Sequence, residues 1–110
     1  MIGSLLVVVR RPKGEEFSTL GIRTAWATHA AAIETKLLYI EDGVYNLIES
    51  PGYNTEMLKK FIGEGGAVYA LRSHMEERGL TGEGFVQGVE IIPPEDVPDL
   101  VEECEASTIF

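Results

Sequence analysis

The chain has 110 residues, 45% of them hydrophobic, and a formal net charge of −9 at pH 7. Enough apolar side chains are present for a core, which excludes a disordered chain, and the negative charge argues against direct binding of nucleic acid. No apolar run approaches the roughly 18 residues of a membrane span, and no basic segment precedes the first apolar run as in a signal peptide. We therefore expect a cytoplasmic protein with no membrane partner.

Strand-like and helix-like segments alternate along the chain. Strands are predicted over 5–9, 36–40, 67–71, 89–93 and 107–110. Helices are predicted over 19–34, from Asn54 or Thr55 to 64, from Ser73 to Gly79 and from Asp96 to 104, with a short helical turn over 44–48. This alternation predicts one α/β domain over 1–110, flavodoxin-like, with a mostly parallel sheet of about five strands and helices on both faces.

Side-chain patterns define the helices further. Ser18 is predicted to cap the first helix, and Ser73 with Glu76 has the spacing of a capping box. The first helix is rich in alanine, and its face includes Ile22, Trp26 and His29, so we interpret His29 as a core or interface histidine. The last helix is predicted to turn Val97, Leu100, Val101 and Cys104 toward the core.

Two segments at strand ends could hold an anion. A basic loop with Arg10, Arg11 and Lys13 follows the first strand, and Arg72-Ser73-His74 follows the third. If the first strand lay between the second and third, both segments would flank one crevice at the carboxyl ends of the strands. Arg10, Arg11, Arg72, Ser73 and His74 are therefore the candidate ligand-binding residues. The loop lacks a nucleotide-binding glycine pattern, so a subunit contact or a solvated rim is the alternative.

The remaining candidates point away from catalysis. His74 is either an acid, base or anion ligand, or the exposed first residue of a capped helix. The two histidines with Glu41 or Asp42 are too sparse to predict a metal site, and we expect no cofactor. The single cysteine, Cys104, cannot form an internal disulfide; it lies on a predicted buried face beside acidic residues that would raise its pKa. No catalytic residue is predicted.

The chain resembles the DsrE/DsrF/DsrH-like sulfur-relay proteins, most closely their TusC/DsrF-like branch. The resemblance rests on the run from Leu5 to Arg10 leading into an alanine-rich helix, and on the motifs Asp42-Gly43-Val44 and Arg78-Gly79-Leu80. The segment Tyr39–Tyr45 and the terminal Ser107–Phe110 extend it over nearly the whole chain.

The resemblance implies a small flavodoxin-like domain that assembles into trimers, hexamers or mixed complexes. It also implies transfer of persulfide sulfur between proteins, for tRNA thiolation or sulfur oxidation. Active members of the family carry a cysteine at the end of the third strand, where this chain has Leu71 or Arg72.

Two hypotheses about function follow. The first is a non-catalytic, cysteine-less subunit or partner in sulfur transfer. The second is a small anion- or metabolite-binding module, or a minor enzyme, that uses the strand-end crevice. For either one we expect a homo-oligomer (a dimer, trimer or hexamer) or a mixed complex with paralogues. The small-residue helix and the apolar side chains of Phe85, Val86 and Phe110 are predicted to contribute to subunit contacts.

Overall fold

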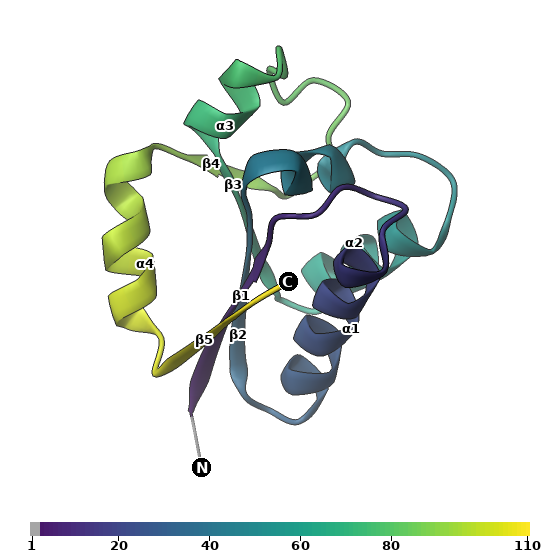
Figure 1. Cartoon of the computed structure of the whole chain (residues 1–110). Helices are drawn as coiled ribbons and strands as arrows, with labels where there is room; N and C mark the ends of the chain where they lie inside the picture. Colours follow the sequence, from purple (N-terminus) through teal and green to yellow (C-terminus); the bar gives the residue numbers. More distant parts are fainter. Residues whose placement is uncertain (1–2) are drawn as a thin grey trace.

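The computed structural model describes residues 3–110, and in this part of the chain all strands join one parallel sheet (Figure 1). The first two residues, which bear on the expectation that no signal peptide precedes the domain, lie outside the described part. The strands are β1 (Ser4–Val9), β2 (Glu34–Tyr39), β3 (Ala67–Leu71), β4 (Glu90–Ile92) and β5 (Ala106–Ile109). The α-helices are α1 (Glu16–Ala30), α2 (Tyr53–Gly63), α3 (Arg72–Glu77) and α4 (Val97–Glu103), and the 3-10 helices are η1 (Glu41–Leu47) and η2 (Pro94–Asp96).

Helices cover both faces of the sheet, which confirms the predicted α/β class. In Figure 1, α1 and α2 pack on one face and α4 on the other, while α3 lies beyond the carboxyl ends of the strands. Alternate residues of β1 serve the two cores: Val7 and Val9 pack beneath α1 and α2, and Leu6 and Val8 pack beneath α4. All six residues of β1 are buried, as the continuous apolar run predicts.

The lateral order of the strands differs from the predicted one. The order is β4-β3-β2-β1-β5, so β1 pairs with β2 and β5 and not with β3. The prediction that the first strand lies between the second and third is therefore wrong. The chain steps outward from β1 to β4, and α4 then returns it to the other side of β1. The strand order consequently reverses between β1 and β5.

Two predicted helix caps are also wrong. Helix α1 begins at Glu16, so Ser18 lies inside its first turn, where the buried hydroxyl donates to the Glu15 carbonyl at 2.8 Å. Helix α3 begins at Arg72, so Ser73 lies inside the helix, and the N-terminus of α3 has no side-chain cap. In both cases the residues just before the serine are already helical: Glu16 and Phe17 in α1, and Arg72 in α3.

Two apolar side chains have a different environment from the one predicted. Val101 is 45% exposed, whereas Leu100 and Cys104, which directly follows α4, are buried and Val97 is half-buried against the same core. Val86 is 2% exposed and is not free to form a subunit contact, whereas Phe85 is half-buried against the core of this chain and its subunit contact stays a prediction.

The contact that joins the turn after β2 to the end of β1 needs a glycine. A Cβ atom on Gly43 would lie 2.1 Å from the Val9 carbonyl oxygen and 3.2 Å from the Arg10 Cα. The same carbonyl accepts a hydrogen bond from the Ile40 amide at 3.0 Å. Because the obstacle is backbone in the centre of the sheet, it cannot move aside as a flexible side chain would.

We expect Gly43→Ala to lower the free energy of unfolding by about 3 kcal/mol, because the added methyl group displaces η1 from β1. Gly63→Ala is the matched control: nothing lies within 4 Å of the added atom at this exposed helical position, and alanine there stabilises by up to roughly 1 kcal/mol. Urea denaturation of both variants measures the difference. Equal stability of the two variants would show that η1 does not rest on β1.

Candidate functional site

A cavity lies where the strand order reverses, at the carboxyl ends of β1 and β5. Its volume is about 240 Å³, and it is lined by Arg10, Arg11, Phe17, Ile109 and Phe110. In open α/β sheets, ligands bind in the crevice outside the carboxyl ends of the strands at such a reversal. We call these five residues the switch-point cavity.

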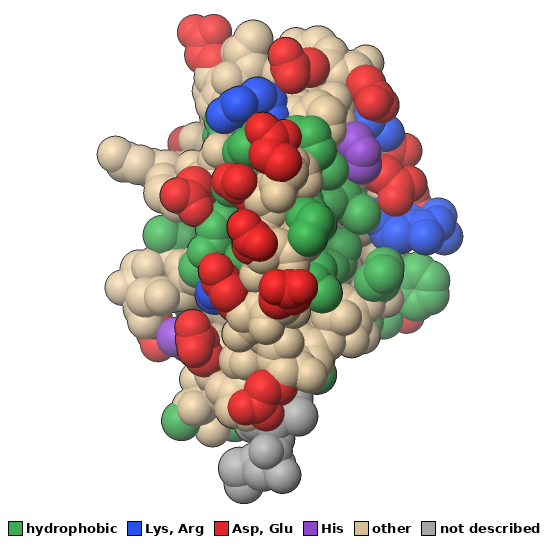
Figure 2. Space-filling model, turned by 90° about the vertical axis from the view of Figure 1, so that its left-hand side faces the viewer, with side chains coloured by type: hydrophobic (Ala, Val, Ile, Leu, Met, Phe, Trp, Pro, Cys, Tyr) green, Lys and Arg blue, Asp and Glu red, His purple; other side chains and the backbone are tan. Residues whose placement is uncertain are grey.

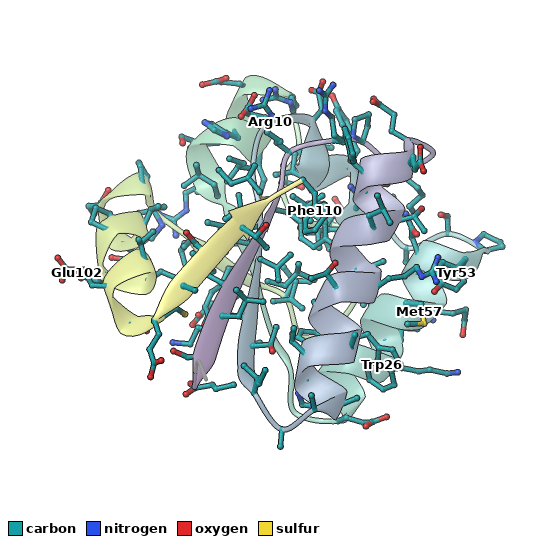
Figure 3. All side chains as sticks on the ribbon, turned by 60° about the horizontal axis from the view of Figure 1, so that its bottom comes forward. Arg10, Trp26, Tyr53, Met57, Glu102 and Phe110 are labelled. Atoms are coloured by element: carbon teal, nitrogen blue, oxygen red, sulfur yellow. The ribbon has the colours of Figure 1, made fainter. Side chains whose placement is uncertain are left out.

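The backbone of the two strands fixes the floor of the switch-point cavity. The Phe110 amide donates to the Val8 carbonyl at 2.8 Å, and the Arg10 amide donates to the Phe110 carbonyl at 3.0 Å. Figure 3 shows Phe110 between the sheet and α1, with Arg10 beyond the end of β1. Gly21 lets α1 approach closely here, since a Cβ atom would lie 2.5 Å from Val9 Cγ2.

The lining of the cavity combines two arginine side chains with three large apolar side chains. Phe17 is 50% exposed and Ile109 is 61% exposed. Arg11 faces Glu15 at 3.7 Å in an exposed pair, a type of contact that contributes less than about 1 kcal/mol. Arg10 forms no ion pair with any residue of the described range 3–110.

Lys13, the third base of this loop, points elsewhere. Its ammonium group donates to the Ile48 carbonyl at 2.9 Å, to Ser50 Oγ at 2.6 Å and to Thr55 Oγ1 at 3.2 Å. Partial burial among neutral oxygens lowers the pKa of Lys13. The three donor hydrogens are engaged, so Lys13 ties the loop to the segment before α2 and to the first turn of α2.

A buried asparagine that sequence analysis did not single out also positions the loop. The side-chain amide of Asn46 donates to the Arg11 carbonyl at 2.8 Å and to the Gly43 carbonyl at 2.9 Å. Asn46 is 1% exposed. Its position within the apolar segment 44–48 could have indicated this role, because an amide buried with its apolar neighbours needs hydrogen-bond partners.

The other predicted ligand residues lie in a different place. Arg72 lines a separate cavity of about 320 Å³. Strand β2 lies between β1 and β3, so the strand order on which the common crevice depended does not exist. The structure brings Arg10 and Arg11 together and places Arg72, Ser73 and His74 apart from them, on α3. Anion binding by any of the five stays a prediction.

His74 joins α3 to the turn after β2. Its Nδ1 accepts a hydrogen bond from the Glu41 amide at 2.7 Å, across 33 positions of sequence. Glu41 has a φ of 51°, unusual for a residue other than glycine, and this contact helps to hold it. His74 lies inside α3, which begins at Arg72, so it is not the first residue of a capped helix; its role as an acid, base or anion ligand stays a prediction. His29 lies between Trp26 and Phe61, at ring-centroid distances of 6.1 and 5.4 Å.

The two motifs most specific to the resemblance form one contact. Arg78 Nε donates to Asp42 Oδ1 at 2.9 Å, and Arg78 Nη1 donates to the His74 carbonyl at 3.0 Å. The contacts of Arg78 with Asp42 and of His74 with the Glu41 amide together attach α3 to η1. The motifs around Gly43 and Gly79 therefore have a structural explanation that requires no ligand.

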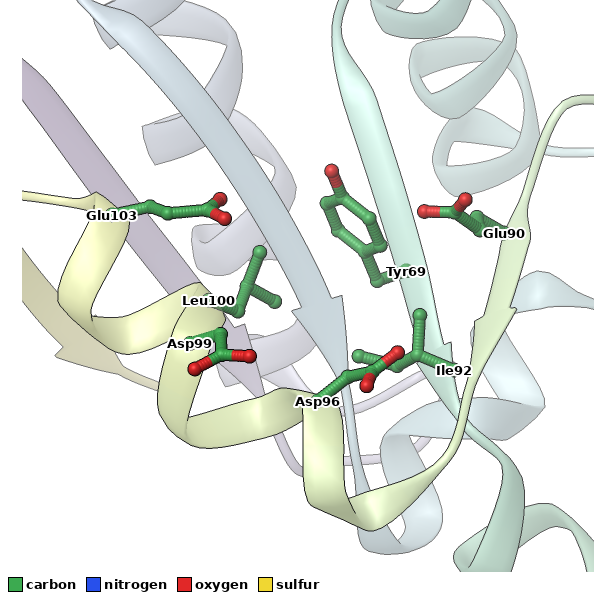
Figure 4. A pocket seen from close by; sticks show the side chains of 7 residues that line it. All are labelled: Tyr69, Glu90, Ile92, Asp96, Asp99, Leu100 and Glu103. Atoms are coloured by element: carbon green, nitrogen blue, oxygen red, sulfur yellow. The ribbon is translucent and has the colours of Figure 1, made fainter.

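A second cavity, of about 300 Å³, lies beside α4 on the opposite face of the sheet, and it is acidic. It is lined by Tyr69, Glu90, Ile92, Asp96, Asp99, Leu100 and Glu103 (Figure 4). Glu103 pairs with Lys36 at 2.5 Å. Figure 2 shows carboxylates gathered over this face. Such a surface repels anions and the phosphates of nucleic acid.

The single cysteine lies at the opposite edge of the sheet from the carboxyl ends of the strands. Cys104 follows α4 directly, just before the amino end of β5, and is 9% exposed, as predicted for the buried face. Burial raises the pKa of its thiol, with smaller contributions in the same direction from Glu34 and Glu103, while Lys36 lowers it. Both effects of burial, a smaller thiolate fraction and restricted access, oppose nucleophilic chemistry.

Residues 3–110 contain no grouping of three His, Cys, Asp or Glu side chains able to hold a metal ion. Within the same range, no helix combines the length and the apolar character that crossing a bilayer requires.

Comparison with known proteins identifies relatives of this chain. A family model described as the DsrE/DsrF-like family matches residues 3–107. An uncharacterized protein of Methanopyrus kandleri, MK0008, is 32% identical over 111 residues, covering 96% of this chain and 91% of that protein.

Two solved structures have the same fold. The YchN protein from E. coli superposes with a TM-score of 0.86 at 20% identity, covering 100% of both chains. MTH1491 from Methanobacterium thermoautotrophicum, a protein of unknown function, superposes with a TM-score of 0.79 at 15% identity, covering 97% of this chain and 98% of that one. At these identities the two structures establish the fold.

The contact between His74 and Glu41 requires a particular tautomer. Because Nδ1 accepts a hydrogen bond, we expect the ring proton of neutral His74 on Nε2, which ¹⁵N chemical shifts of the ring will report. His74→Ala should accelerate exchange of the Glu41 amide by up to about tenfold. A proton on Nδ1, or unchanged exchange in the variant, would contradict this contact.

Proposed function

Because this chain belongs to the DsrE/DsrF-like family, we propose that it is a non-catalytic subunit or partner in intracellular sulfur transfer, such as tRNA thiolation or sulfur oxidation. The resemblance to the TusC/DsrF-like branch is part of this proposal. We also propose that it acts in the cytoplasm, where single free thiols remain reduced.

The observation that carries the proposal is the chemistry at the end of β3. Sulfur relay requires a thiolate that a partner protein can reach. The strand ends at Leu71, which is 7% exposed, and the next residue is the exposed Arg72. The one cysteine of the sequence, Cys104, is buried beneath α4. A chain with this arrangement can assemble with sulfur carriers, but it lacks a thiol of its own at the strand end.

The proposed partners are proteins. Acidic side chains over α4 disfavour direct contact with tRNA. On the opposite face, a hollow of about 460 Å³ is lined by residues of α1 and the start of α2: Leu20, Arg23, Thr24, Trp26, Ala27 and Tyr53. Tyr53 is 52% exposed there. We propose this hollow as the surface for a homo-oligomer or for a mixed complex with paralogues, since exposed aromatic side chains are enriched at interfaces.

One observation favours a second candidate function, a small-anion-binding module. The switch-point cavity presents two guanidinium groups at the position where α/β sheets bind ligands. This function does not depend on a thiol, so it is compatible with a non-catalytic role in an assembly.

The proposal that this chain carries no persulfide sulfur can be tested by incubation with a cysteine desulfurase and free cysteine, followed by intact-mass analysis. We expect no persulfide on folded Cys104, and labelling by a thiol reagent at least about tenfold slower in the folded protein than in denaturant, because burial restricts access and raises the pKa.

Arg72→Cys, made together with Cys104→Ser, is the matched comparison for that experiment. It places one exposed thiol at the end of β3, and we expect this thiol to react rapidly in the folded protein. Stoichiometric persulfide on Cys104 of the wild-type chain would overturn the proposal and identify the protein as a sulfur carrier.

Assembly can be tested by light scattering. We expect a species larger than the 12.1 kDa chain at micromolar concentration. Tyr53→Glu should shift it toward the monomer, because a carboxylate would be buried in an apolar contact. Lys60→Gln, at an exposed site on the same helix, should leave the assembly intact. A monomer at all concentrations would contradict the homo-oligomer, and equal behaviour of the two variants would place the interface elsewhere.

A further inference from the structure

We propose that the switch-point cavity binds a small carboxylate with a compact apolar body, such as an aromatic or short branched carboxylic acid. This inference deepens the second candidate function and rests on it for the presence of an anion at this place. It adds the class of ligand, which follows from the shape and the chemistry of the lining residues.

The cationic side of the cavity selects a single negative group. Arg10 is exposed and has no ion-pair partner within residues 3–110, and Arg11 is held only by the 3.7 Å contact with Glu15. A ligand carboxylate can therefore take both guanidinium groups without breaking a strong contact, and it matches the geometry of the guanidinium fork. Glu15 adds a nearby negative charge, which disfavours a multiply charged phosphate at the same site.

The apolar side of the cavity selects the body of the ligand. Phe17 and Ile109 are at least half exposed, although both are large hydrophobic residues, and Phe110 is the third apolar residue of the lining. An inorganic anion would leave these surfaces in water. A ligand with a ring or a branched chain removes them from water and gains the corresponding hydrophobic free energy.

The volume sets the size of the ligand. The cavity of about 240 Å³ exceeds the roughly 150 Å³ that holds a benzene molecule in an engineered protein cavity. It has room for one ring and a carboxylate. The backbone hydrogen bonds between Phe110 and the two strand residues Val8 and Arg10 hold the floor in place before a ligand arrives.

The test is a titration with benzoate, followed by amide NMR shifts, with acetate, benzamide and inorganic phosphate as comparison probes. We expect benzoate to shift the amides of residues 10–17 and 109–110 and to bind roughly tenfold more tightly than acetate, which lacks the apolar body. Benzamide, which keeps the ring and loses the charge, should bind at least about tenfold more weakly than benzoate.

Variants separate the contributions of the lining residues. Arg10→Gln should weaken benzoate binding by about tenfold or more. Phe17→Ser should remove the preference for benzoate over acetate while acetate still binds. Glu15→Gln should strengthen binding, because it releases Arg11. Lys60→Gln, which removes one positive charge from an exposed site on α2, outside the cavities described above, is the matched control and should leave binding unchanged.

The outcomes distinguish the two levels of the proposal. Equal affinity for benzoate, acetate and phosphate at this cavity would overturn the ligand class while the anion-binding module remains. Shifts that cluster at Arg72 and His74, or no binding of any probe, would overturn both. Benzamide binding as tightly as benzoate, or an equal loss in Arg10→Gln and Lys60→Gln, would show that the arginine of this cavity does not recognise the ligand.

Discussion

The contact between the Gly43 turn and the backbone of Val9 is the constraint on which the strand-end region depends. Because Gly43 has no side chain, η1 can lie directly on the end of β1. From that position Asn46 reaches the Arg11 carbonyl, and the Glu41 amide reaches His74. The loop after β1 and helix α3 are thus held by the same turn. This close approach therefore contributes both to the direction of the loop, which Lys13 also anchors, and to the attachment of α3.

The sequence predicted the elements of this fold more successfully than their arrangement. The spacing of apolar residues and the positions of glycine and proline located every strand. These are local signals, as the apolar run of β1 and the glycines after α2 illustrate. The lateral order was wrong, since alternation of strands and helices leaves open whether the third strand pairs with β1 or with β2. Ser18 and Ser73 were misassigned as caps because a serine near a helix start can also lie inside the first turn. The Ser18 hydroxyl there bonds to the backbone, and Ser73 is the second residue of α3.

Only the part of the candidate site that depends on local sequence could be predicted. Arg10 and Arg11 follow a buried parallel strand, so their place at a strand end could be read from the sequence. Their apolar neighbours could not, since Ile109 and Phe110 reach them only through the pairing of β5 with β1. Likewise, Asp42 and Arg78 belong to motifs that the resemblance singled out, but their ion pair spans 36 positions and required the structure.

The uneven distribution of charge has a consequence for how the molecule meets others in solution. Seven acidic residues and no basic residue lie between Glu90 and the last position, whereas four of the nine basic residues lie between Arg10 and Arg23. A molecule charged in this way has a permanent dipole moment, and its field acts over about a Debye length before any contact forms. An approaching partner is therefore turned during diffusion, so that its own charges select which face collides first. Ionic strength then changes how fast complexes form more than how long they last.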